Sequence, residues 1–327
     1  MSSIVKNELL KRLFEAGGEP VSGQEIAEQF GLSRTAIWKY VKELEQEGYE
    51  IGTIRKKGYY LIQSPDLVNE ANVQNHLATK TYGRNILYYE TCPSTQLIAH
   101  DEAQNGAADG TVVISEEQTS GKGRLSRPWS SVSGKGIWMS IIARPSLTPQ
   151  QAPQLTLVAA VAVTRAIEEL TGIEPAIKWP NDILVDGRKV TGILTELQAD
   201  PDRVKAIILG IGMNVNQEKA DFPEELQEIA TSLKLVAGKE VDRAELIAKI
   251  LGYLELYVDM YVKHGFAPIK LVWEGYSNTM GKRIRAVMLH ETIEGTAVGI
   301  SDEGVLEVRL DDGSVRGIFS ADIEIPK

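Results

Sequence analysis

The sequence predicts a multidomain α+β protein with three folded units in its 327 residues. At roughly 150 residues per domain, a chain of this length holds two or three domains. The pattern of the sequence also changes twice. Helical spacing and a hairpin give way near residue 64 to mixed strands and helices, and near residue 276 to short strands separated by turns. We expect units at residues 1–63, 76–275 and 276–327, with a linker at residues 64–75.

The first unit is predicted to contain three helices and a hairpin. Apolar residues at helical spacing predict a first helix that stops before Gly17 and a second over residues 23–30. A tight turn at residues 31–33 precedes a third helix that ends near Glu47, and two strands flank a basic turn at residues 55–58. This order of elements is typical of a winged helix-turn-helix domain.

Such a domain holds its third helix so that it can enter a DNA major groove, while cations at the helix start and in the wing contact phosphates. The alternative is a small helical packing domain with a solvated charged face. The predicted DNA-binding residues are Arg34, Thr35, Trp38, Lys39, Lys42, Arg55, Lys56 and Lys57.

Composition limits the other classes of function. The chain is 43% hydrophobic and 24% charged, as globular proteins are. Its one cysteine, Cys92, excludes an internal disulfide framework and a Cys-rich zinc site, and favours the reducing cytoplasm. The sequence contains no run of about 18 apolar residues, so we expect no membrane span. Charges within the N-terminal stretch argue against a secretory signal.

The net charge is unevenly distributed. The total of −10 argues against a nucleic-acid partner, but residues 1–63 hold nine basic and nine acidic residues. The acidity lies in residues 64–275, at −7, and residues 276–327, at −3. Weak attraction of a neutral N-terminal unit to DNA would make DNA binding depend on dimerisation.

The central unit is predicted to form a mixed α/β sheet. Apolar runs predict strands such as Val204–Leu209, and a long apolar helix spans residues 153–171. Further helical patterns cover residues 222–233 and 242–263. Strands joined by hairpins, as at residues 185–188, argue against a regular βαβ arrangement. Four short strands within residues 283–319 predict a small β-barrel at the C-terminus.

Three segments of the central unit carry polar or glycine-rich patterns. Residues 117–129 place Lys122 between two glycines and Arg124 directly after them, a pattern that suits an anion and lacks Walker A spacing. The alternative is an exposed, flexible basic loop. Residues 178–196 include Lys-Trp-Pro-Asn-Asp and Lys189, which could supply charge, a stacking face, amide hydrogen bonds and a metal-binding carboxylate. The alternative is that they serve only strand packing and turns. Residues 210–216 lack the third glycine of a dinucleotide-binding turn. A purely structural turn is therefore as well supported as a turn that approaches a ligand.

Together and in this order, these segments resemble the biotin–protein ligase family, specifically its bifunctional members that also repress the biotin operon. The matching motifs are Ser94-Thr95-Gln96, the Gly121–Arg124 loop, residues 178–182, Lys189 before Gly192, and Gly210–Asn214. Lys122 departs from the pattern, because many members carry arginine there. The resemblance implies a central mixed-sheet domain of the biotin/lipoate ligase type and a C-terminal SH3-like barrel.

The resemblance also implies a two-step reaction. Biotin and ATP with Mg²⁺ give biotinyl-5′-AMP, and biotin then passes to a lysine of a biotin carboxyl carrier domain of acetyl-CoA carboxylase or another biotin-dependent carboxylase. When no carrier awaits modification, the adenylate-bound chain would form a homodimer and bind the biotin operator.

The family's site residues transfer to matching positions here. The implied catalytic residues are Lys189, Arg124 and Lys122. Biotin would contact Ser94, Thr95, Gln96, Gln118, Lys122, Gly123, Arg124 and Lys189. The nucleotide would contact Arg124, Arg127, Trp179, Asn181 and Asn214, and Asp182 is the expected Mg²⁺ ligand.

Two other functions compete with this interpretation. A lipoate–protein ligase shares the central fold, but the winged domain and the Gly-Lys-Gly-Arg loop favour biotin. A biotin-sensing repressor without catalysis is the second alternative. The complete set of Lys122, Arg124, Asp182 and Lys189 argues against it.

Overall fold

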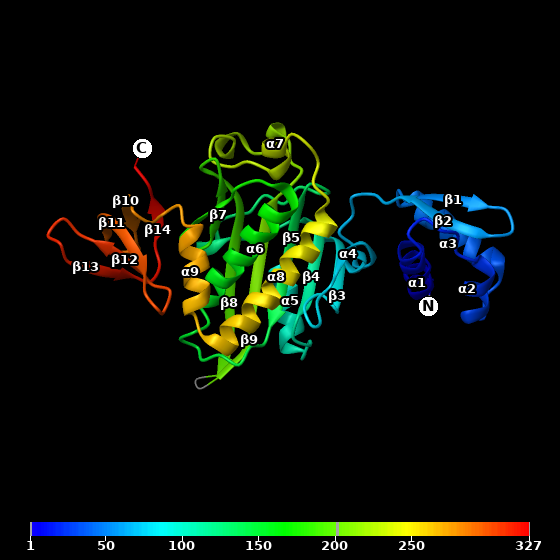
Figure 1. Ribbon diagram of the computed structural model, residues 1–327, viewed down its shortest axis with the longest axis horizontal. Coiled ribbons are helices and arrows are strands. Elements are labelled where there is room, and N and C mark those ends of the chain that lie inside the picture. Colours follow the sequence, from blue (N-terminus) through cyan, green and yellow to red (C-terminus); the bar gives the residue numbers. More distant parts are fainter. Residues whose placement is uncertain (1, 201–202, 327) are drawn as a thin grey trace.

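The computed structural model describes residues 2–200 and 203–326. Its three parts lie in a row along the long axis of the molecule: a small N-terminal domain, a large central domain and a small C-terminal β domain (Figure 1). The two chain ends therefore lie toward opposite sides of the molecule, with the central domain between them.

The N-terminal domain has the three helices and the hairpin that the sequence predicts. Its elements are α1 (Ser2–Glu15), α2 (Gly23–Gln29), α3 (Arg34–Gln46), β1 (Glu50–Ile54) and β2 (Gly58–Gln63). The Ser33 hydroxyl accepts a hydrogen bond from the Ala36 N–H at 3.2 Å and caps α3. Ile37, Val41 and Leu44 are buried, as their helical spacing predicts.

Residues 64–75, expected to be a linker, are packed against the central domain. They contain most of helix α4 (Glu70–His76), and both Val68 and Val73 are fully buried in the central core. Asp66 forms an ion pair with Arg243 at 2.9 Å. The polar start of the segment suggests a flexible connection, but its two valines find apolar partners that are distant in the sequence.

A buried hydrogen-bonded group joins the N-terminal domain to α4. The Tyr49 hydroxyl donates to Asn72 Oδ1 at 2.7 Å and accepts from Asn69 Nδ2 at 2.9 Å. Burial raises the pKa of Tyr49 to about 12. Tyr49, which belongs to the core of the N-terminal domain, is therefore hydrogen-bonded to the segment that packs against the central domain.

The central sheet has seven strands in the order β3-β4-β5-β9-β8-β7-β6. Among the described strands of this sheet, only β3 and β4 pair in parallel, and the other neighbours are antiparallel. The strands are β3 (Ile86–Cys92), β4 (Thr111–Gln118), β5 (Gly136–Ala143), β6 (Ala176–Lys178), β7 (Asp182–Val185), β8 (Arg188–Asp200) and β9 (Arg203–Asn214). This is the mixed sheet that the hairpin signals predict.

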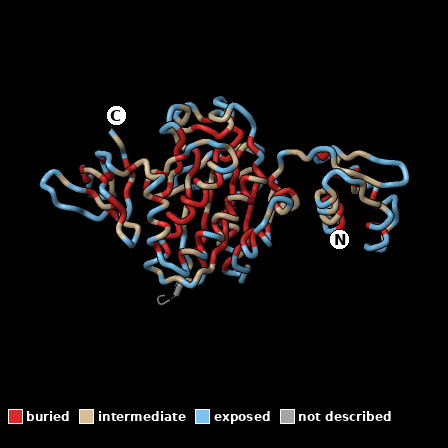
Figure 2. The backbone as a smooth tube through the Cα atoms, viewed as in Figure 1, coloured by how far each residue is buried: buried red, intermediate tan, exposed pale blue. Residues whose placement is uncertain are grey.

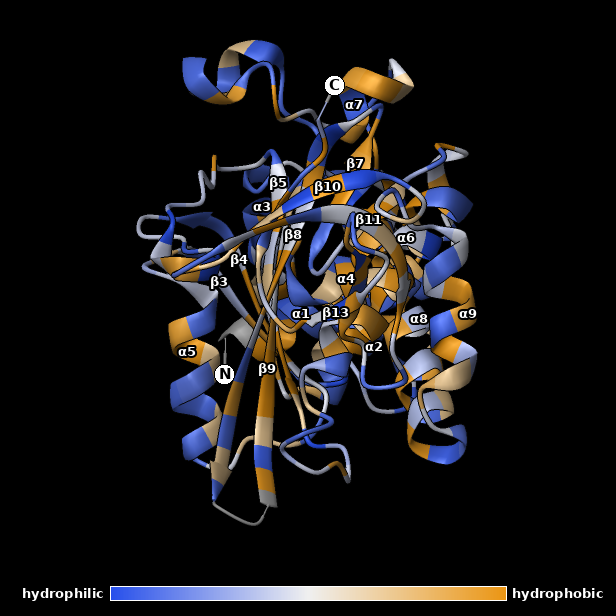
Figure 3. Cartoon of the chain, turned by 90° about the vertical axis from the view of Figure 1, so that its left-hand side faces the viewer, coloured by the Kyte–Doolittle hydropathy of each residue, from blue (hydrophilic) through white to orange (hydrophobic). Residues whose placement is uncertain are grey.

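Helices cover the two faces of this sheet unequally (Figure 3). One face packs against α6 (Gln154–Thr171) and α8 (Arg243–His264), and α9 (Ala267–Gly275) packs on these two helices. The other face carries α5 (Thr95–Gln104) over β4, β5 and β9. Burial is concentrated between the sheet and its helices (Figure 2). Part of the α5 face is left without a helix, and the ligand cavity described below lies there.

Residues 222–233 do not form the helix that their pattern predicts. They contain the 3₁₀ helix Glu224–Leu226, and the short helix α7 (Leu233–Ala237) begins only at their end. The Lys189 N–H donates to the Ile229 carbonyl at 2.8 Å, and the Thr231 N–H donates to the Lys189 carbonyl at 2.9 Å. This strand-like pairing with β8 overrides the local helical pattern.

The C-terminal domain is a five-stranded antiparallel sheet in the order β13-β12-β11-β10-β14. The strands are β10 (Arg283–Val287), β11 (Thr292–Ile300), β12 (Leu306–Arg309), β13 (Val315–Ile318) and β14 (Asp322–Glu324). The predicted small β domain is confirmed. In the described residues β13 and β14 are its edges, with no pairing between them that would close a barrel.

No helix within residues 2–200 or 203–326 is long and apolar enough to cross a membrane.

Candidate active site

One cavity of about 760 Å³ gathers nearly all of the predicted ligand-binding residues. It lies where strands β5, β9, β8 and β7 meet the loop at residues 118–132. Its lining includes Ser94, Thr95, Gln96, Gln118, Lys122, Gly123, Arg124, Arg127, Asn181, Asp182, Lys189 and Asn214. Residues more than 100 positions apart in the sequence thus share one site.

Small residues on three neighbouring strands form the floor of the cavity. Ser140 lies opposite Gly210 on β9, and Gly212 lies opposite Gly192 on β8. A Cβ atom at Gly210 would lie 2.5 Å from the Gln96 Oε1 atom, and one at Gly212 would lie 2.6 Å from the indole of Trp129. These two glycines lie inside a strand rather than in a turn, and their lack of a side chain makes room for Gln96 and Trp129.

One end of the cavity is lined by neutral hydrogen-bonding groups. Ser94 and Thr95 start helix α5 and are buried. The Thr95 N–H donates to Gln118 Oε1 at 2.9 Å, and Gln118 Nε2 donates to Ser131 Oγ at 2.9 Å. The Thr95 hydroxyl lies 2.9 Å from the Ser140 hydroxyl. This end suits an uncharged polar group.

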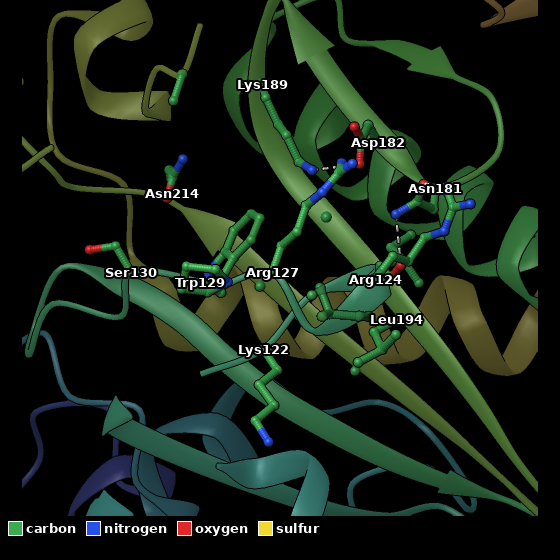
Figure 4. A pocket seen from close by; sticks show the side chains of 18 of the residues that line it. Lys122, Arg124, Arg127, Trp129, Ser130, Asn181, Asp182, Lys189, Leu194 and Asn214 are labelled. Atoms are coloured by element: carbon green, nitrogen blue, oxygen red, sulfur yellow. Dashed lines mark hydrogen bonds and ion pairs between the residues drawn. The ribbon is translucent and has the colours of Figure 1, made fainter. Parts of the chain in front are cut away.

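The other end is cationic. Lys189 Nζ lies 2.7 Å from Asp182 Oδ1 and 5.2 Å from the centre of the Trp129 ring. Arg124 Nη1 donates to Asn181 Oδ1 at 2.9 Å. Figure 4 shows both pairs on the same side of Trp129. Cations gathered in this way suit carboxylate and phosphate oxygens.

The glycine-rich loop is folded over this end. The Gly123 N–H donates to the Arg127 carbonyl at 2.8 Å, and Leu125 and Ser126 adopt positive φ values of 55° and 57°. The C-terminal domain holds the loop in two places, because Arg124 donates to Ser320 at 3.0 Å and Arg127 forms an ion pair with Asp322. The loop is therefore held by specific contacts, although residues 125–128 remain exposed.

Lys122 is placed differently from the other cations of the loop. Its side chain is exposed and extends away from the Lys189–Asp182 pair (Figure 4). It still lines the cavity, on the side of Trp129 that faces away from Lys189. The structure therefore groups Arg124 and Arg127 with Lys189, and sets Lys122 apart.

The structure places Trp179 outside the cavity. Its side chain is only 3% exposed, and its indole N–H donates to the Gly304 carbonyl of the C-terminal domain at 3.2 Å. Packing between domains thus explains this tryptophan. The aromatic side chains that line the cavity are Trp129, at the end of the predicted loop, and Phe222.

Ser140 and Lys178 also line the cavity and were not among the predicted site residues. Lys178 could have been predicted, because it is the first residue of the 178–182 motif. Ser140 had a weaker signal, a single hydroxyl within an otherwise apolar strand.

The described residues offer little to hold a metal ion by themselves. They contain no group of three or more His, Cys, Asp or Glu side chains that could bind one. The predicted ligand, Asp182, is a single carboxylate that is already paired with Lys189. This donor set fits Mg²⁺ that arrives on the phosphates of a nucleotide, and it does not fit an ion held by the protein alone.

The predicted DNA-binding residues form an exposed basic surface. Arg34, Thr35 and Lys39 are exposed on α3, and the cations Arg55, Lys56 and Lys57 are exposed in the β1–β2 turn. Within the described part of the chain, no acidic side chain pairs with these five cations. Lys42 differs, because it pairs with Glu45 and lies 6.0 Å from the ring of Trp38.

Comparison with known proteins agrees with this architecture. Models of an HTH domain, the biotin/lipoate A/B protein ligase family and the biotin protein ligase C-terminal domain match residues 5–60, 88–214 and 279–325. The bifunctional ligase/repressor BirA of Bacillus subtilis is 49% identical over 325 residues, which cover 99% of this chain and 100% of the relative. The chain belongs to the family of bifunctional biotin ligase/repressors.

Two further members of the family extend the comparison. The bifunctional ligase/repressor BirA of Escherichia coli is 27% identical and covers 95% of this chain and 94% of its own length. The solved biotin protein ligase from Aquifex aeolicus, in complex with biotin and ATP, is 30% identical with a TM-score of 0.65. That match covers 75% of this chain and 99% of the Aquifex chain.

Proposed function

We propose that this chain joins biotin to ATP as biotinyl-5′-AMP and then transfers biotin to a lysine of a biotin carboxyl carrier protein. The observation that carries the proposal is the division of one cavity into a neutral polar end and a cationic end, with Trp129 between them. A fused ureido ring with a carboxylate tail needs both ends. The relatives named as biotin ligases support the choice of substrate.

The first step joins two anions. A carboxylate oxygen of biotin attacks the α-phosphorus of ATP, the bond to the bridging oxygen breaks, and pyrophosphate leaves. Lys189 and Arg124 would reduce the repulsion by exchanging Asp182 and Asn181 for ligand oxygens. Mg²⁺ on the phosphates would neutralise further charge. Arg127 and Asn214 are proposed to contact the nucleotide, and Trp129 replaces Trp179 as its aromatic neighbour.

In the second step, the amine of the carrier lysine attacks the acyl carbon of the adenylate, AMP leaves, and an amide forms. The chain would contribute chiefly by positioning and by excluding water from a reactive acyl phosphate. The folded loop supports this role, since Gly123 and Arg124 belong to the lining of the cavity. Lys122, which extends away from Lys189, is proposed to lie beside biotin rather than beside the phosphates.

The exchange of labelled pyrophosphate into ATP tests the first step. We expect label in ATP when biotin is present and none when biotin is omitted or replaced by lipoate. Exchange that lipoate supports better than biotin would identify a lipoate–protein ligase. Biotin binding without any exchange would identify a sensor that lacks catalysis.

We also propose that the adenylate-bound chain forms a homodimer and binds the biotin operator through α3 and the β1–β2 turn. The support is the set of exposed cations on one small domain of zero net charge. Two copies would present two such domains to two half-sites. Sedimentation and operator binding, each measured with and without the adenylate, test this proposal. Unchanged values would contradict it.

A further inference from the structure

A chain of hydrogen bonds runs from the neutral end of the cavity to the protein surface. The Thr95 and Ser140 hydroxyls lie 2.9 Å apart, and the Ser140 hydroxyl donates to Gln96 Oε1 at 2.9 Å. Gln96 Nε2 then donates to Glu196 Oε2 at 2.8 Å. Thr95, Ser140 and Gln96 line the cavity, whereas Glu196 does not, and the Glu196 side chain is 44% exposed.

The Glu196 carboxylate at the outer end fixes the direction of every hydrogen bond in this series. An ionised carboxylate accepts hydrogen bonds and donates none, so the amide nitrogen of Gln96 must face Glu196. The amide oxygen of Gln96 then faces Ser140 and receives its hydroxyl hydrogen. Ser140 can only accept from Thr95 once its own hydrogen is committed.

His100 holds the carboxylate in place. The amide nitrogen of Gln198 donates to the His100 carbonyl and to His100 Nδ1, each at 2.9 Å. Because Nδ1 accepts, the ring hydrogen lies on Nε2 and points to Glu196 Oε2 at 3.0 Å. Both groups that meet this carboxylate oxygen are therefore donors.

A second amide constrains Thr95 from the other side. The Thr95 backbone N–H donates to Gln118 Oε1 at 2.9 Å, which fixes that oxygen toward Thr95. The Thr95 hydroxyl lies 3.2 Å from the same oxygen. The Thr95 hydrogen thus has two partners, Ser140 and Gln118, and both can only accept. Inside the cavity, the Thr95 oxygen is left as an acceptor.

We propose that Glu196 is a positioning residue that sets specificity for a ligand N–H group. Acting through Gln96, it commits the Ser140 hydrogen away from Thr95, so that Ser140 does not donate to the Thr95 oxygen. That oxygen is then left to accept from an N–H of a cyclic urea. The neighbouring Ser94 hydroxyl does not cap α5 and is free to donate to the urea carbonyl. The inference rests on the proposed function, because it assigns the biotin ring to this end.

Two substitutions of the same residue separate hydrogen-bond direction from charge. Glu196→Gln removes the charge but can still present an oxygen to Gln96. Glu196→Lys presents only donors, so it turns the Gln96 amide around and makes Ser140 accept from Gln96. Ser140 then donates to the Thr95 oxygen and competes with the ligand N–H. Glu102→Lys is the matched control because it makes the same charge reversal two residues after His100 on α5. The Glu102 side chain takes no part in this series of hydrogen bonds.

The assay is biotin-dependent pyrophosphate exchange with biotin and with a cyclic carbamate analogue in which one ring N–H is replaced by oxygen. We expect Glu196→Lys to raise the KM for biotin about tenfold, as loss of one hydrogen bond does, with kcat and the KM for ATP unchanged. Its preference for biotin over the carbamate should fall by a similar factor. Glu196→Gln and Glu102→Lys should stay within about threefold of the parent protein.

Several outcomes would overturn the proposal. One is a folded Glu196→Lys protein, checked by thermal melting, whose KM for biotin and preference over the carbamate are unchanged. Equal damage from Glu196→Gln would assign the effect to charge, and equal damage from Glu102→Lys would assign it to nonspecific charge reversal. Absence of exchange in the parent protein would instead contradict the proposed function itself. The two failures are therefore distinguishable.

Discussion

The two ends of the cavity are built in different ways. At the neutral end, Thr95, Gln96 and Ser140 are buried and hydrogen-bonded to one another or to fixed neighbours. At the cationic end, Lys189 and Arg127 remain partly or fully exposed and pair with single side chains. A neutral ring is recognised by donors and acceptors set in advance, whereas a phosphate transfer needs cations that can exchange partners. Substitutions at the two ends should therefore affect different kinetic constants.

The largest effect is expected for Lys189→Ala at the cationic end. Removal of this cation should lower kcat for biotin-dependent exchange by about 10²–10³-fold, because it stabilises charge that develops during transfer. The KM for biotin should change little. Lys249→Ala, which removes a lysine paired with Glu169 on the surface, serves as the control. Normal exchange by Lys189→Ala would refute this role.

A smaller effect of a different kind is expected at the neutral end. Thr95→Val keeps the shape of the side chain and removes its acceptor, so the KM for biotin should rise about tenfold while kcat is retained. Steady-state exchange at varied biotin concentration measures both constants. A fall in kcat with an unchanged KM would contradict the division between the two ends.

Containment of the intermediate depends on the glycine-rich loop that is folded over the cationic end. Arg124→Gly removes the hydrogen bonds to Asn181 and Ser320, so the loop should hold the adenylate less well. The escaped adenylate should label lysines of bystander proteins, with several-fold more labelling than the parent protein gives. Streptavidin blotting of serum albumin incubated with the protein, biotin and MgATP measures this labelling. No increase would argue against containment by Arg124.

The smallest effect is expected at the contact with the C-terminal domain. Asp322→Asn weakens an ion pair with Arg127, whose side chain is exposed, and such pairs contribute at most about 1 kcal/mol. The KM for ATP should change by no more than about threefold. A loss as large as that of Lys189→Ala would show that the C-terminal domain takes part in the chemistry directly.

Local patterns allowed much of the fold to be predicted. Ile37, Val41 and Leu44 at helical spacing placed α3, and hairpin signals at residues 185–188 indicated an antiparallel pairing. Errors arose where distant segments decide the structure. Residues 222–233 pair with Lys189, and the valines at positions 68 and 73 pack into the central core.

The same distinction applies to the site. Twelve of the residues predicted from the motifs line one cavity. The motifs could not show that Trp129, and not Trp179, is the tryptophan that lines it. Their difference depends on Gly304, which lies in another domain, and on Gly192 and Gly212, which leave space for the Trp129 ring. Nor could spacing show that Asp182 is already paired with Lys189.

Mass spectrometry of a biotin carboxyl carrier domain incubated with this protein, biotin and MgATP tests the central claim most directly. The account predicts a mass gain of one biotinyl group, located on a single lysine of the carrier, and none when ATP or biotin is omitted. A carrier whose mass is unchanged, or one modified by lipoate in place of biotin, would contradict it.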